Sequence, residues 1–229
     1  MNRSEPTPQA PAALQSDSLR KAINDRERDC DAMVDVLGEV IGLKSYELKL
    51  HCQRVTAFTI ALARSMGISG DRLRVIARGA FLHDIGIIGV PDAILFKQGP
   101  LNLGETEMLR QHCIRGYHIV GKIPFLADAA EIIYAHEEWY DGTGYPRRLR
   151  GDEIPLGARI FSVAHAFDAI TWERRTYRPK RSTASAREEI AGLAGRQFDP
   201  HAVAAFLKTR SSVWDGLRQE VDSETRRFA

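Results

Sequence analysis

Hydrophobic residues recur at three- and four-residue steps along most of this chain, which is the spacing of one buried face of an α-helix. Val55, Phe58 and Leu62 form one such set. Asp199 followed by Pro200 is a typical N-cap and first helical position, so another helix is expected to begin there. The period-two alternation that is typical of strands is nowhere sustained. The pattern therefore predicts an all-α fold.

The same pattern divides the chain into four expected segments. Residues 1–18 are polar and Pro-bearing without an apolar period, and are expected to form a disordered lead. Residues 19–45 form an N-terminal helical segment, whose apolar stripe fits either packing on its own domain or a homodimer. Residues 46–210 form the single domain. Residues 211–229 are charged with few apolar anchors, and are expected to be a loosely held helix or tail.

Composition excludes several classes of protein. Among the 229 residues, 44% are hydrophobic, and 32 Lys+Arg balance 30 Asp+Glu to a net charge of +2. This charge gives no broad cationic field, so a nucleic-acid polymer is not an expected partner. No stretch reaches the roughly 20 apolar residues that span a bilayer, so no membrane association is expected. Cys30, Cys52 and Cys113 lack Cys-x-x-Cys spacing and are interpreted as reduced thiols in a cytoplasmic protein.

Five of the seven histidines share a short stretch or a helix face with a carboxylate. An all-helical bundle can gather such ligands from several helices to hold two transition metals. The mixed nitrogen and oxygen donors suit Fe, Mn or Zn better than a structural thiolate zinc site, and two metals are typical of phosphoester hydrolysis. The residues concerned are Glu47 with His51, His83 with Asp84, His112 after Glu105, His136 with Glu137 and Glu138, and His165 with Asp168.

Taken singly, several of these residues also have an ordinary structural interpretation. Glu47 and His51 are four residues apart on one helix face, where a surface hydrogen bond is the commoner arrangement. His112 alone fits a solvated histidine, and His165 within an apolar helix fits a satisfied core histidine. The adjacent pair His83-Asp84 follows an apolar run, and buried charges need a partner or a metal. Residue types alone do not choose a substrate.

Ordered motifs lie between and after these clusters, and together they resemble a known family over about residues 33–207. The resemblance is to the HD-GYP domain of the HD superfamily, which implies a single helical bundle with a GYP loop. The motifs are His83-Asp84-Ile85-Gly86, Gly89-Val90-Pro91-Asp92, Asp141-Gly142-Thr143-Gly144-Tyr145-Pro146 and Gln197-Phe198-Asp199-Pro200.

The resemblance implies a bacterial signal-transduction hydrolase that opens cyclic di-GMP to pGpG or GMP at two or more divalent metals, usually iron or manganese. It implies that His83 and Asp84 are catalytic and that Tyr145, Arg175 and Arg178 bind substrate, and we expect Asp168 to act in catalysis with them by orienting a ligand or a water. The implied metal ligands are Glu47, His51, His83, Asp84, His112 and His136, and we expect Glu137 and His165 to bind metal as well.

Three positions depart from the family pattern, and each lies in or beside a motif. Ile87 stands where the family has a lysine, Glu137 replaces the second His of a His-His pair, and His165 replaces a ligand Asp. Glu137 and His165 can both bind metal, and together they leave the formal ligand charge unchanged. We therefore hypothesise that these two residues share a metal. The stretch from Thr171 to Tyr177 is also one residue longer than in the family.

These departures leave two main interpretations of function open. The first is a phosphodiesterase that hydrolyses cyclic di-GMP, weakened by the loss of the lysine cation. The second is a degenerate module that binds cyclic di-GMP, or docks a diguanylate cyclase through its GYP loop, without turnover. A third interpretation keeps a hydrolase but changes the substrate to another phosphoester, and the retained GYP loop argues against it.

Overall fold

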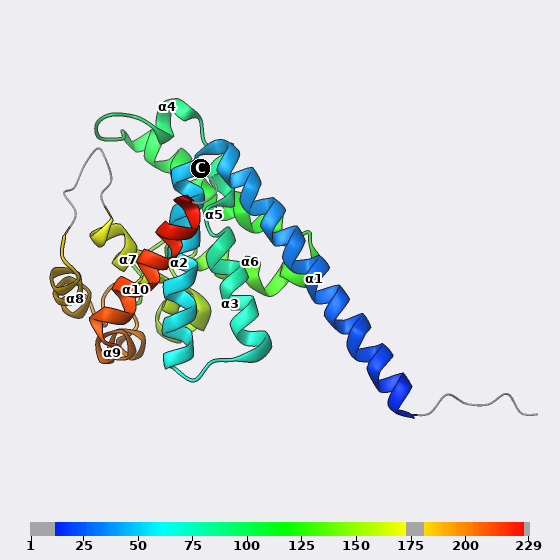
Figure 1. Ribbon diagram of the computed structural model, residues 1–229. Helices are drawn as coiled ribbons and strands as arrows, with labels where there is room; N and C mark the ends of the chain where they lie inside the picture. Colours follow the sequence, from blue (N-terminus) through cyan, green and yellow to red (C-terminus); the bar gives the residue numbers. More distant parts are fainter. Residues whose placement is uncertain (1–11, 173–180, 227–229) are drawn as a thin grey trace, which may run out of the picture. The chain divides into compact units, whose positions relative to one another are not determined.

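Helices make up the regular structure of the computed structural model, which describes residues 12–172 and 181–226 (Figure 1). Within these residues no strand forms, and residues 194 and 198 make only an isolated bridge. The all-α prediction is therefore confirmed. The elements are α1 Ala12–Lys44, α2 Tyr46–Ser65, α3 Gly70–Leu82, η1 Ile85–Gly89, α4 Asp92–Leu95, α5 Leu103–Val120, η2 Pro124–Leu126, α6 Ala127–Ala135, η3 Gly151–Glu153, α7 Leu156–Thr171, α8 Thr183–Gly192, α9 Pro200–Lys208 and α10 Ser211–Arg226.

Local capping chemistry sets where the helices begin. The Ser45 side chain accepts a hydrogen bond from the Leu48 backbone N–H and separates α1 from α2. Asn102 and Glu105 form a reciprocal capping box at the start of α5. Asp199 caps α9 as predicted, accepting from the His201 backbone N–H at 2.7 Å. The caps satisfy N–H groups that the first helical turn leaves without partners.

Contacts divide the chain into two compact units, Met1–Val36 and Leu37–Ala229. In the first unit the described residues form the N-terminal part of α1, which begins at Ala12. Helix therefore covers residues 12–18, which the sequence led us to expect as disordered. Ala12, Ala13 and Leu14 have high helix propensity, and this outweighs the missing apolar period. The prediction for residues 1–11 lies outside the described residues.

The second unit is built around α2 (Figure 1). Helices α3, α7 and α10 all contact α2, while α5 lies against α6 and η1. Of the helix or tail that we expected over residues 211–229, the structure forms a helix, α10, and Trp214 on it is only 1% exposed. Its ring lies 6.2 Å from Phe58, 5.9 Å from Phe167 and 5.1 Å from Phe206, centroid to centroid. Burial of one large aromatic ring outweighs the polar character of the rest of this helix.

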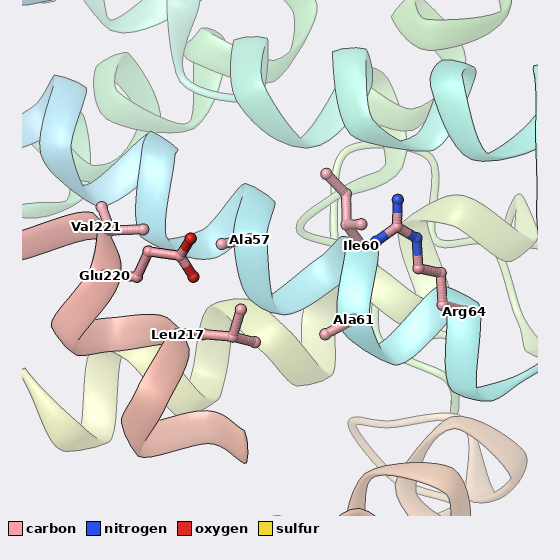
Figure 2. A pocket seen from close by; sticks show the side chains of 7 residues that line it. All are labelled: Ala57, Ile60, Ala61, Arg64, Leu217, Glu220 and Val221. Atoms are coloured by element: carbon pink, nitrogen blue, oxygen red, sulfur yellow. The ribbon is translucent and has the colours of Figure 1, made fainter. Parts of the chain in front are cut away.

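A shallow groove runs between α2 and α10 (Figure 2). The side chains that α2 gives to this groove lie on a different helix face from His51, as their spacing in the sequence requires. No candidate metal ligand lines it. The lining residues are Ala57, Ile60, Ala61, Arg64, Leu217, Glu220 and Val221. Among the described helices, none combines the length and apolar character that a bilayer crossing requires.

Candidate metal centre

Several helices bring their histidines to one buried region of the second unit. His51 lies within α2, His112 within α5 and His165 within α7, while His83 and His136 are the residues that end α3 and α6. His83 is fully buried, and His51, His112 and His136 are 8%, 4% and 3% exposed. Buried imidazoles in this number need polar partners. Their arrangement therefore indicates a functional centre.

Backbone carbonyls orient three of these rings in the same way. Nδ1 of His83 lies 2.8 Å from the Ala80 carbonyl oxygen. Nδ1 of His112 and Nδ1 of His136 each lie 2.7 Å from the carbonyl oxygen three residues earlier. A carbonyl oxygen only accepts, so each Nδ1 carries the proton and donates it. In a neutral ring the Nε2 atom then carries the lone pair that can bind a metal, and at His83 a metal would replace the proton that Nε2 shares with Asp84 in the metal-free protein.

The Asp168 carboxylate orients the ring of His51 in the same way. Nδ1 of His51 lies 2.7 Å from Oδ2 of Asp168, and Arg54 donates to that carboxylate from Nε at 2.8 Å and from Nη2 at 3.1 Å. Arg54 is 1% exposed and its guanidinium stacks 3.7 Å from the centroid of the Trp172 ring. Although burial opposes it, the bonds from His51 and Arg54 hold the pKa of Asp168 well below its usual range. Asp168 is therefore a charged group that orients His51.

The free nitrogens gather into two groups. In the first, which we name the His83 cluster, one ligand atom each of His51, His83 and His165 lies within 4.8 Å of the others. In the second, the His112 cluster, the same holds for His112, Cys113 and His136. Both groups are composed of described residues. They provide two neighbouring sets of donors for metal ions.

Asp84 lies between the two clusters. Its Oδ2 is 3.2 Å from Nε2 of His83, and its Oδ1 is 3.6 Å from Nε2 of His112. Although burial opposes it, the neighbouring His83 holds the pKa of Asp84 well below its usual range. Asp84 is thus ionised and directs one oxygen toward each cluster. A carboxylate placed in this way can bridge two metal ions.

The donors fit divalent metals on two observations of this structure. The buried Nε2 atom of His51 has no hydrogen-bond partner. Nε2 of His112 and Nε2 of His136 face each other at 3.0 Å, although both are lone pairs. Burial and the neighbouring His112 ring lower the pKa of His136 well below its ordinary value, which keeps the ring neutral. Unpaired lone pairs in a buried site are stabilised by a bound cation.

The close approach of α5 explains the glycine of the His83-Asp84-Ile85-Gly86 motif. A Cβ at Gly86 would lie 2.0 Å from the His112 carbonyl oxygen and 2.7 Å from the Gly116 nitrogen. Any side chain there would push α5 away, and His112 with it. The short η1 segment therefore sets the separation between the two clusters.

The loop that follows His136 is anchored by Glu138. This side chain is 3% exposed, and its two oxygens accept hydrogen bonds from the backbone N–H groups of Arg147 at 2.7 Å and Leu149 at 3.1 Å. Burial raises the pKa of Glu138. A Cβ at Gly144 would lie 2.2 Å from the Trp139 nitrogen, so the loop folds tightly onto the end of α6. The GYP loop is thereby held beside the histidines.

Tyr145 projects from this loop and contacts Glu137 and Arg110. Its side chain forms a hydrogen bond with Glu137, and the Arg110 guanidinium lies 4.8 Å from the centre of its ring. Burial raises the pKa of the Glu137 carboxyl. Burial also raises the pKa of Tyr145, so the phenol is neutral. This arrangement provides an aromatic ring and a cation next to the His112 cluster.

The structure separates some residues that the sequence had grouped. His165 belongs to the His83 cluster, whereas Glu137 pairs with Tyr145, so the described geometry does not bring together the two residues that we expected to share a metal. Glu47 is exposed on α2 and belongs to neither cluster. Ile87 is 6% exposed within η1. The predicted phosphate-binding residues Arg175 and Arg178 lie outside the described residues.

Three residues of the site were missed by the sequence reasoning or given no role there. Arg54 has a signal that could have found it, since it lies three residues after His51 on the same helix face. Glu138 was noted beside His136 without a role. Cys113 follows His112 directly, and helical spacing alone does not place neighbouring residues on one face. Contact between α5 and α6, rather than spacing, brings Cys113 near His136.

The fold and the buried histidine-aspartate centre define a class of protein. Residues 35–202, most of the chain, match the HD domain family. The chain therefore belongs to the HD domain family, and the HD-GYP resemblance of its motifs is confirmed. A solved HDG"Y"P protein from Bdellovibrio bacteriovorus has the same fold, with a TM-score of 0.58 at 21% identity over 78% of this chain and 63% of that one.

Two curated relatives indicate which reactions proteins of similar sequence perform. A cyclic di-GMP phosphodiesterase of Thermotoga maritima is 37% identical over 84% of this chain and 53% of its own length. A 3'3'-cGAMP-specific phosphodiesterase of Vibrio cholerae is 34% identical over 75% of this chain and 33% of its own length. The chain thus spans about half or less of the length of these relatives.

Proposed function

We propose that this protein is a metal-dependent phosphodiesterase that hydrolyses a cyclic dinucleotide, with cyclic di-GMP as the first candidate. The observation that carries the proposal is the convergence of the Nε2 atoms of His83 and His112 on Asp84, with His51 and His136 in the two adjoining clusters and the Nδ1 atom of all four rings already bonded. Such preorganised ligands are typical of a catalytic metal centre. The names of the relatives support the choice of substrate class.

In the proposed reaction each part of the chain has a separate task. His51, His83, His112, His136 and Asp84 hold the metals, with His165 as a further donor in the His83 cluster. When bound, divalent metals polarise phosphoryl oxygens and activate water at neutral pH. Asp168 and Arg54 keep His51 in one orientation.

Substrate contact is assigned to the loop beside the His112 cluster. Tyr145 offers a ring face for a purine base, and its bond with Glu137 fixes the direction of that ring. Arg110 provides positive charge for a phosphate near the loop. The apolar side chain of Ile87 supplies no charge where the family has a lysine, so slow turnover is expected.

A hydrolysis assay with metal analysis tests this function. We expect protein loaded with Fe(II), Mn(II) or Zn(II) to bind about two metals per chain and to convert cyclic di-GMP to pGpG or GMP. Asp84→Asn, which leaves the volume unchanged, should lower the rate by at least about 100-fold. Hydrolysis of 3'3'-cGAMP in place of cyclic di-GMP would correct the substrate. Binding of cyclic di-GMP by fully loaded protein without any product would overturn the enzyme proposal in favour of a binding module.

Partners and location beyond the substrate belong to the same proposal. The ordered GYP loop offers a surface for a diguanylate cyclase, and α1 offers an apolar stripe for a homodimer. Cys52 and Cys113 are buried free thiols, which supports the cytoplasm as the compartment. A pull-down with a purified cyclase and light scattering of the full chain test these two interactions.

A further inference from the structure

The sulfur of Cys113 lies among the free nitrogens of the His112 cluster. Its side chain is fully buried, and Sγ is 3.5 Å from Nε2 of His112. The ligand atoms of Cys113, His112 and His136 all lie within 4.8 Å of one another. The cysteine is therefore part of a three-residue donor set.

The separations within this set match those of ligands around one metal ion. With metal–nitrogen bonds near 2.05 Å and metal–sulfur bonds near 2.3 Å, two tetrahedral ligands lie about 3.3 Å apart for two nitrogens and about 3.6 Å apart for nitrogen and sulfur. The corresponding distances here are 3.0 Å between His112 and His136 and 3.5 Å between His112 and Cys113. The third pair, Sγ of Cys113 and the ligand nitrogen of His136, lies within 4.8 Å.

From this arrangement we propose that Cys113 is a thiolate ligand of the metal that His112 and His136 hold. The proposal rests on the metal centre of the proposed function and adds a donor to it. Two imidazoles and one thiolate select a soft or borderline ion such as Zn(II), Fe(II) or Co(II) over Mn(II), which prefers oxygen ligands. The two clusters then differ in kind, because the His83 cluster contains only nitrogen donors.

Cobalt substitution tests the ligand directly and does not depend on activity. Metal-free full-length protein is titrated with Co(II) and its absorption spectrum is recorded. A bound thiolate should produce a near-ultraviolet sulfur-to-cobalt charge-transfer band. We expect this band in the unaltered protein, and a loss of at least tenfold in intensity in Cys113→Ser.

Two other cysteines provide matched controls. Cys52 is buried and faces His83 without belonging to a cluster, and Cys30 lies in the first compact unit. Cys52→Ser and Cys30→Ser should each retain the band. Persistence of the band in Cys113→Ser, its loss in Cys52→Ser alone, or its absence from unaltered protein with Co(II) bound would each overturn the proposal.

A second measurement covers the case in which Cys113→Ser does not fold. Zinc X-ray absorption of the folded Cys52→Ser protein should require a sulfur scatterer at about 2.3 Å. A spectrum fitted by nitrogen and oxygen alone would refute Cys113 ligation. If the protein hydrolyses the cyclic dinucleotide but its spectrum contains no sulfur signal, the proposed function stands and Cys113 ligation fails. If the spectrum contains a sulfur signal but no hydrolysis occurs, Cys113 ligation stands and the proposed function fails.

Discussion

Each cluster of the metal centre contains a ring that a backbone carbonyl orients, but only the His83 cluster also contains a ring that a side chain orients. In the His112 cluster, backbone carbonyls of α5 and α6 fix the rings of His112 and His136. In the His83 cluster, a side chain fixes His51, namely Asp168, which Arg54 binds in turn. A carbonyl cannot be removed by substitution, whereas a carboxylate can. The His83 cluster is therefore the one that a single change at an orienting residue can disrupt.

Among the residues that orient a ligand or the loop, Asp168→Asn is expected to have the largest effect. The change removes the charge that holds His51 and leaves Arg54 buried without its anionic partner. Because loss of one partner of a buried ion pair is strongly destabilising, we expect the free energy of unfolding to fall by about 3 kcal/mol. Metal affinity should fall by about 10- to 100-fold, since the change removes the group that orients a ligand. Chemical denaturation and metal titration measure the two quantities.

The matched control for this change is Asp152→Asn. Asp152 is also paired with an arginine, Arg159, but its side chain is 90% exposed. An exposed pair contributes about 0–1 kcal/mol, so stability and metal affinity should remain nearly unchanged. Equal effects of the two substitutions would show that Asp168 acts as an ordinary surface charge and would refute its orienting role.

The same contrast explains how much of the centre the sequence could predict. His83, Asp84, His112 and His136 were found because their residue types and motifs are visible in the sequence. Which atoms of these residues meet depends on helix packing, which residue spacing does not specify. Cys113 is the example, because its sulfur approaches His136 only through the contact of α5 with α6.

The fold shows a similar limit. Helix type was predictable from the hydrophobic period, and the cap at Asp199 lies at the predicted helix start. The packing of α10 against the core was not predictable, because it depends on one residue, Trp214. A local average of polarity describes the other residues of that helix correctly and misses the anchor. Burial of a single side chain is a tertiary property.

A smaller effect is expected beside the His112 cluster from Glu138→Gln. An amide has one accepting oxygen, so one of the two loop N–H groups, of Arg147 or Leu149, loses its partner. We expect kcat/KM for the cyclic dinucleotide to fall about tenfold, since a hydrogen bond to a charged group contributes about 1.5–3 kcal/mol. Metal content should not change, because no ligand is touched.

Glu131→Gln is the control for the loop. Glu131 also binds Arg147, through the side chain at 3.1 Å and near the surface, so its loss should leave kcat/KM within about twofold. Steady-state kinetics and metal analysis of both variants separate loop position from metal binding. A fall in metal content in Glu138→Gln would contradict the assignment of this residue to the loop.

The smallest effect concerns the pH dependence of the His83 cluster in metal-free protein. Burial and the neighbouring imidazoles His51 and His83 lower the pKa of His165 well below its ordinary value. The unfolded chain therefore binds a proton at His165 below about pH 6.5 while the folded chain does not, and stability falls as the pH falls. Replacing His165 by Gln should reduce the acid-induced loss of unfolding free energy by about 1.4 kcal/mol at pH 5.5. Above pH 7.5 the pH dependence of the unfolding free energy should not change.

Urea denaturation of metal-free protein between pH 5 and 8 measures this difference. His201→Gln is the control, since His201 is exposed on α9 and belongs to neither cluster. His83, whose pKa Asp84 raises although burial opposes it, acts in the opposite sense: its contribution is present at low pH and is lost as the pH rises. It is unchanged in His165→Gln, so comparison of the variants cancels it. An unaltered slope in His165→Gln would mean that His165 is solvated, and that the His83 cluster is open to water where the His112 cluster is closed.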